Sequence, residues 1–90
     1  MVGINAAKYK LMPTSPDVDL KKVEEDAKKI VEEFGGTQRE NSIEPVAFGL
    51  KSLTIFFSYP DDKETEKLED KFASIENVAS AQLIDMRKIA

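Results

Sequence analysis

Hydrophobic and polar residues alternate strictly in two stretches of the chain. From Ala7 to Leu11, apolar side chains alternate with lysines, which predicts a strand with one buried face that ends at Met12-Pro13. Residues 50–59 form a longer and more apolar run, which predicts a central strand. We expect its buried face to carry Leu53, Ile55, Phe57 and Tyr59.

Two other stretches repeat with the period of a helix. The first has an apolar stripe made of Leu20, Val23, Ala27, Ile30, Val31 and Phe34. Asp19 is placed to cap its first turn, and Gly35-Gly36 is placed to end it. The second helix is indicated by Thr65, Leu68, Phe72 and Ile75, after the segment "PDDKE".

Two weaker strand patterns complete the chain. Residues 37–48, "TQRENSIEPVAF", are polar and contain Pro45, which suits an edge strand because proline cannot donate to a sheet ladder. Residues 76–90 alternate in one phase up to Leu83 and in the other phase from Ile84, which predicts a bulge or a change of exposure there.

The resulting order is strand, helix, strand, strand, helix, strand. This order predicts an α+β fold of the ferredoxin-like split βαβ type (βαββαβ), a four-stranded antiparallel sheet with both helices on one face. The first and third strands are central, and the other face of the sheet is left free. We expect residues 1–90 to form one domain.

Composition excludes several kinds of chemistry. The chain has neither cysteine nor histidine, which removes disulfides, thiolate nucleophiles, zinc-thiolate sites and the usual general base. A net charge of -4 argues against a phosphate backbone as the main partner. The N-terminus has no basic leader before an apolar run, and no later run is long enough for a bilayer. We therefore expect a cytoplasmic protein with no membrane contact and no cofactor.

The acidic residues near the predicted helix starts have two interpretations. Asp61, Asp62 and Glu64 could hold a hard cation, but they lack the spacing and the turn glycine of a calcium loop. We interpret them as helix caps, and Asp17 and Asp19 in the same way, so we predict no metal site.

Two activities known on this fold require residue patterns that can be recognised in a sequence. An acylphosphatase would need an arginine and an anion cradle in the first strand-to-helix loop, and "MPTSPDVDL" has neither. An RNA-recognition module would show the pattern K/R-G-F/Y-G/A-F-V-x-F/Y on the third strand, and "VAFGLKSLTIFF" shares only a Phe-Gly pair with it. RNA binding stays the alternative function.

The predicted fold does not explain two features of the sequence. In the corner "PVAFGLKSL", Phe48 precedes Gly49, and base rates for aromatics favour a core position over exposure to a partner. The closing "DMRKIA" places Arg87 and Lys88 at the end of an acidic chain, where solvated side chains are the ordinary expectation.

Three segments together resemble a known family. "PTSPDVDL", "EPVAFGLKSLTI" and "MRKI", in this order and spacing over nearly the whole chain, are similar to archaeal elongation factor 1-beta and to the C-terminal exchange domain of its eukaryotic relatives. The resemblance implies a ferredoxin-like guanine-nucleotide exchange factor for elongation factor 1-alpha. Such a factor releases GDP by binding, so it is not an enzyme and needs no covalent chemistry.

The resemblance also implies site residues. Lys88 matches the lysine that is inserted beside the magnesium and phosphate site of the GTPase. Phe48, with Gly49, matches the aromatic corner that contacts a second domain of that partner. Arg87, the neighbour of the lysine, is a further candidate for binding the partner, although eukaryotic members carry an uncharged polar residue there. No direct contact with nucleic acid is implied.

Overall fold

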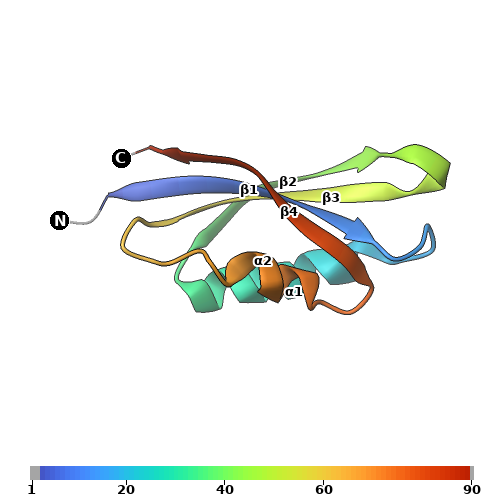
Figure 1. Ribbon diagram of the computed structural model, residues 1–90, viewed down its shortest axis with the longest axis horizontal. Helices are drawn as coiled ribbons and strands as arrows, with labels where there is room; N and C mark the ends of the chain where they lie inside the picture. Colours follow the sequence, from blue (N-terminus) through green and yellow to red (C-terminus); the bar gives the residue numbers. More distant parts are fainter. Residues whose placement is uncertain (1–2, 90) are drawn as a thin grey trace.

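Four strands and two helices follow each other in the predicted order (Figure 1). The computed structural model describes residues 3–89. The elements are β1 (Ile4–Pro13), α1 (Leu20–Phe34), β2 (Thr37–Pro45), β3 (Lys51–Pro60), α2 (Leu68–Ala73) and β4 (Val78–Lys88), with a one-turn segment, Ala47–Gly49, between β2 and β3.

The strands form one antiparallel sheet in the order β2-β3-β1-β4. The two strands with the strongest alternation, β1 and β3, therefore lie in the centre, and both helices cover the same face (Figure 1). This confirms the α+β ferredoxin-like fold. Within residues 3–89, neither helix has the length and hydrophobicity that crossing a membrane requires.

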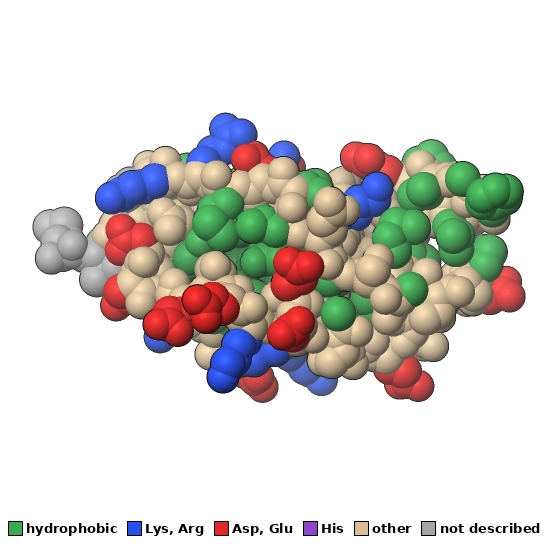
Figure 2. Space-filling model, in the orientation of Figure 1, with side chains coloured by type: hydrophobic (Ala, Val, Ile, Leu, Met, Phe, Trp, Pro, Cys, Tyr) green, Lys and Arg blue, Asp and Glu red, His purple; other side chains and the backbone are tan. Residues whose placement is uncertain are grey.

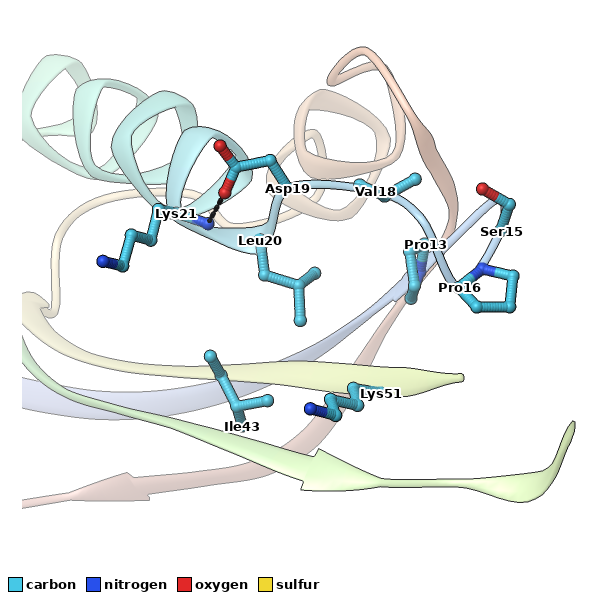
Figure 3. Close-up of a pocket in the computed structure, with 9 residues that line it drawn as sticks. All are labelled: Pro13, Ser15, Pro16, Val18, Asp19, Leu20, Lys21, Ile43 and Lys51. Carbon is cyan, nitrogen blue, oxygen red and sulfur yellow. Dashed lines mark hydrogen bonds between the residues drawn. The ribbon is translucent and has the colours of Figure 1, made fainter. Parts of the chain in front are cut away.

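Helix α1 begins and ends at the predicted residues. The Asp19 carboxylate accepts a hydrogen bond from the Lys21 amide at 3.0 Å (Figure 3), which satisfies one of the free N–H groups of the first turn. Gly35 ends the helix in the left-handed conformation, with φ 92°, and its amide donates to Glu32. Val23, Ala27 and Val31 are buried against the sheet.

The predicted acidic cap of the second helix is wrong. Helix α2 begins only at Leu68, and its N-cap, Lys67, makes no side-chain hydrogen bond. Asp61 instead directly follows β3, where its amide donates to the Gly3 carbonyl at 2.9 Å. The acidic residues of this loop thus lie too early in the chain to reach the helix, and Asp17 is not the cap of α1 either. In the part of the chain that is described, no cluster of acidic side chains could hold a metal ion.

Both edge strands contain a bulge. In β4, Leu83 pairs with Tyr9 and Asp85 pairs with Lys8, so Ile84 is the extra residue at the predicted change of phase. In β2, the register shifts between Gln38 and Asn41. Bulges twist an edge and disturb its ladder, which protects an exposed edge from pairing with another chain.

The centre of the core is a group of three aromatic rings, Tyr9, Phe57 and Phe72. The ring of Tyr9 lies 5.8 Å from that of Phe57 and 5.0 Å from that of Phe72, and all three side chains are buried. Burial raises the pKa of Tyr9 to about 12, so this phenol is neutral at physiological pH. Since Phe72 is the main aromatic contact from α2, it joins that short helix to the sheet.

We expect Phe72→Ala to lower the free energy of unfolding by about 3 to 5 kcal/mol, because it removes a completely buried ring from this group. Urea denaturation followed by circular dichroism measures the loss. Phe56→Ala is the control, since this ring lies partly exposed on the uncovered face, and it should cost less than half as much. Equal losses would contradict a core centred on the three rings.

Candidate functional site

The molecule is long, with extents of 46 × 19 × 19 Å, and its two ends are built from different elements. We call the turn between β2 and β3, residues 46–50, the hairpin end. We call the opposite end the terminal end; there β1 begins, β3 ends at Pro60 and β4 ends at Lys88 (Figure 1). The sequence-predicted residues are divided between them. Phe48 and Gly49 lie at the hairpin end, and Arg87 and Lys88 lie at the terminal end.

The hairpin end holds Phe48 in an unusual backbone conformation. Phe48 has φ 61° and ψ 32°, Gly49 has φ 77°, and the Ala47 carbonyl accepts a hydrogen bond from the Leu50 amide at 3.2 Å. Two successive left-handed residues closed by this bond are typical of a type I′ turn, whose first central position favours asparagine, aspartate or glycine. A phenylalanine there is strained.

Phe48 is 94% exposed, so the interpretation as a core residue is wrong. Aromatic side chains are usually buried, but here the turn directs the side chain away from both layers of the fold. A Cβ on Gly49 would meet no atom within 4 Å, so the glycine is required by its positive φ and not by space. An exposed aromatic on a strained backbone points to a contact outside the chain.

Other apolar side chains surround the hairpin end (Figure 2). Ile43 and Val46 are exposed by 49% and 38%, respectively. Ile43 points from β2 toward Leu20 of α1, and the two side chains form opposite walls of a groove (Figure 3). Sequence reasoning missed Ile43 because its neighbours are polar; a lone isoleucine two residues before a proline was the available signal.

At the terminal end, Lys88 lies on the helix side of the sheet. It pairs with Asn5 of β1, and its side chain is 71% exposed. Its Nζ lies 3.6 Å from Oδ2 of Asp61, in the loop that follows β3. The backbone beyond it is also held, since the Ile89 amide donates to the Ile4 carbonyl at 2.8 Å. An exposed ammonium is therefore carried by a strand whose backbone is hydrogen-bonded on both sides of it.

Arg87 points to the opposite face of the sheet from Lys88, because side chains alternate along a strand. Its guanidinium donates to the Asp85 carboxylate at 2.7 Å. The two adjacent basic residues thus do not form one cationic site.

The uncovered face of the sheet has a shallow hollow with balanced charge. It is lined by Lys8, Lys10, Glu40, Asn41, Ser42, Glu44, Thr54, Phe56, Ile84, Asp85 and Arg87. The Lys8 ammonium lies 5.4 Å from the centre of the Phe56 ring. Among the aromatics of residues 3–89, only Phe56 lies on this face, whereas RNA modules of this fold stack bases on several.

Comparison with known proteins shows the family to which the chain belongs. Residues 6–89 match the model of the EF-1 guanine nucleotide exchange domain. The elongation factor 1-beta of Methanosarcina barkeri is 35% identical over 89 residues, covering 98% of this chain and 100% of its own length. That of Haloarcula marismortui is 40% identical over 86 residues, covering 91% and 93%. That of Pyrococcus horikoshii is 35% identical over 91 residues, covering 99% and 94%.

The matches define a guanine-nucleotide exchange domain. The chain belongs to the elongation factor 1-beta family, and it is a guanine-nucleotide exchange factor for elongation factor 1-alpha in polypeptide elongation. Its role is nucleotide exchange and not covalent catalysis, and the alternative of an RNA-binding module is not favoured.

Phe48→Asn should raise the free energy of unfolding by up to about 1 kcal/mol, because asparagine tolerates the left-handed backbone and the exposed ring contributes no packing. Thermal unfolding of the isolated protein measures the change. Phe48→Ala is the matched control, since it removes the ring but keeps the strain, and it should not be stabilising. A loss of about 3 kcal/mol for either variant would show that the ring packs in the core.

Proposed function

We propose that Lys88 drives GDP release from elongation factor 1-alpha, while Phe48 anchors the factor to a second domain of the same GTPase. The observation that carries the proposal is the placement of these two exposed side chains at opposite ends of one hydrogen-bonded sheet. Two contacts this far apart suit a partner with more than one domain.

The chemistry at the terminal end suits the disruption of a phosphate site. GDP is held in such GTPases by a magnesium ion, a P-loop lysine and backbone amides around the phosphates. The Lys88 ammonium is a compact charge on a four-carbon stem, carried by an anchored strand. Brought beside the partner's magnesium, it would compete with that ion and disturb the loops that hold it.

The contact at the hairpin end suits an anchor. Phe48 has 94% of its surface available, so burying it against a partner gains apolar area without unpacking the factor. Aromatic side chains are frequent among the few residues that dominate binding energy. Gly49 supports the ring indirectly, since it allows the turn that presents it.

Exchange of this kind is linkage between two binding events. The factor binds the nucleotide-free GTPase more tightly than the GDP form, and nucleotide weakens the binding of the factor by the same ratio. No nucleophile, general base or cofactor enters, so we propose that the protein is not an enzyme. We also propose that residues 1–90 form a single exchange domain. It acts in the cytoplasm, without direct contact with nucleic acid or membrane.

Lys88→Ala should reduce the catalysed release of fluorescent GDP from elongation factor 1-alpha by at least about tenfold, because removing a central electrostatic group typically costs that much. The substitution should lower the free energy of unfolding by no more than about 1 kcal/mol, since the side chain is exposed and loses only its ion pair to Asp61. Lys29→Ala, on the solvent face of α1, is the control with the same change of charge. Release of GDP at the wild-type rate by Lys88→Ala would contradict the proposed role of Lys88.

Phe48→Ala should weaken the complex with the nucleotide-free GTPase by about 1 to 3 kcal/mol, the range of an aromatic anchor. Isothermal titration calorimetry measures this loss, and the unchanged stability of the free variant separates it from unfolding. Val46→Ala, two residues earlier in the same turn, serves as the comparison and should have a smaller effect, because this residue exposes less surface. Wild-type affinity of Phe48→Ala would exclude the anchor.

A further inference from the structure

We propose that Asp61 is a positioning residue that holds the Lys88 ammonium on the helix side of the terminal end, ready for insertion into the GTPase. The proposal rests on the proposed function of Lys88. It gives a role to an acidic residue that helix capping leaves unexplained, because α2 begins seven residues later.

Asp61 is the fixed partner of this pair. Its amide donates to the Gly3 carbonyl at 2.9 Å, and the Lys63 amide donates to the Pro60 carbonyl at 3.1 Å, which closes the turn that follows β3. The Asp61 side chain is only 28% exposed, although it lies in a connecting loop. A short carboxylate on a backbone held in this way has few orientations available.

Lys88 is the mobile partner. Its backbone is paired with β1 at Asn5, but its side chain is long and 71% exposed. Because β1 lies between β3 and β4, the two side chains approach from opposite sides and meet across the start of β1, with Nζ 3.6 Å from Oδ2. The ion pair therefore holds the ammonium over the end of the sheet, on the same face that α1 and α2 cover nearer the middle (Figure 1).

The ion pair between Asp61 and Lys88 has a strength suited to orienting the lysine side chain. An exposed ion pair stabilises by about 0.2 to 1 kcal/mol, which biases the side chain by roughly 1.4- to 5-fold. That is enough to favour one orientation of a flexible lysine, and small enough for the phosphate site of a GTPase to replace it. By contrast, the Arg87 guanidinium makes a direct 2.7 Å hydrogen bond to Asp85 on the other face.

The test measures release of fluorescent GDP from elongation factor 1-alpha at increasing concentrations of the 90-residue chain. Asp61→Asn should lower the maximal release rate by about two- to fivefold, because fewer ammonium groups are correctly oriented. The half-saturating concentration should not change, since the anchor at the hairpin end is intact. Asp61→Glu should restore at least half of the lost rate.

Two controls separate positioning from a general effect of charge or stability. Asp62→Asn makes the same change of charge at the adjacent exposed carboxylate and should match the wild type. In the Lys88→Ala background, Asp61→Asn should have no further effect, because a positioning residue acts only through the group it positions. Melting temperatures of the variants should differ by no more than the loss of this one ion pair allows, a few degrees, so that all variants are folded in the assay.

The outcomes distinguish this proposal from the one on which it rests. Wild-type release by Lys88→Ala would overturn the proposed function of that lysine, and positioning with it. Slow release by Lys88→Ala together with full activity of Asp61→Asn would overturn positioning alone. A loss that persists without Lys88, or that Asp62→Asn reproduces, would also overturn it.

Discussion

The ladder between β1 and β3 is the constraint on which the rest of the structure depends. It pairs the two central strands continuously from Ile4 with Pro60 to Leu11 with Leu53, without a shift of register. The two strands have ten residues each and span roughly 33 Å, so this pair of strands sets most of the length of the molecule. The aromatic core lies on its helix side and holds α2 against it. The two ends that carry the candidate site residues are simply the two ends of this ladder.

The residues that stabilise the fold and the candidate site residues lie at different positions along the length of the molecule. The buried rings lie near the middle, where the sheet is covered, whereas the strained residue Phe48 and the exposed residue Lys88 lie where the layers end. A strained turn persists only when its surroundings impose it, and here the paired ends of β2 and β3 do so. Because neither side chain contributes to the core, each is free to serve a partner without weakening the fold.

The architecture could be predicted because its signals are local. Alternation, the helical stripe, the Asp19 cap and the change of phase before Ile84 all depend on residues close in the sequence, and the structure has each of them. The errors concern side chains whose surroundings come from distant segments. Asp61 lies beside Gly3 and Lys88 instead of capping α2, and no local rule connects residues at such separations.

The same limit applies to the candidate site. The exposure of Phe48 depends on a left-handed turn that its own residue type disfavours, so propensity argued for the core while geometry decided the opposite. The resemblance to a family indicated Phe48 as a candidate site residue, but only the fold shows how far Phe48 lies from Lys88. The separation of Phe48 and Lys88 has a physical consequence for the proposed function. Under the proposed function, a GTPase bound at the hairpin end would meet Lys88 as a tethered group. Insertion would then be effectively intramolecular, and binding energy gained at the hairpin end could be used against nucleotide at the terminal end.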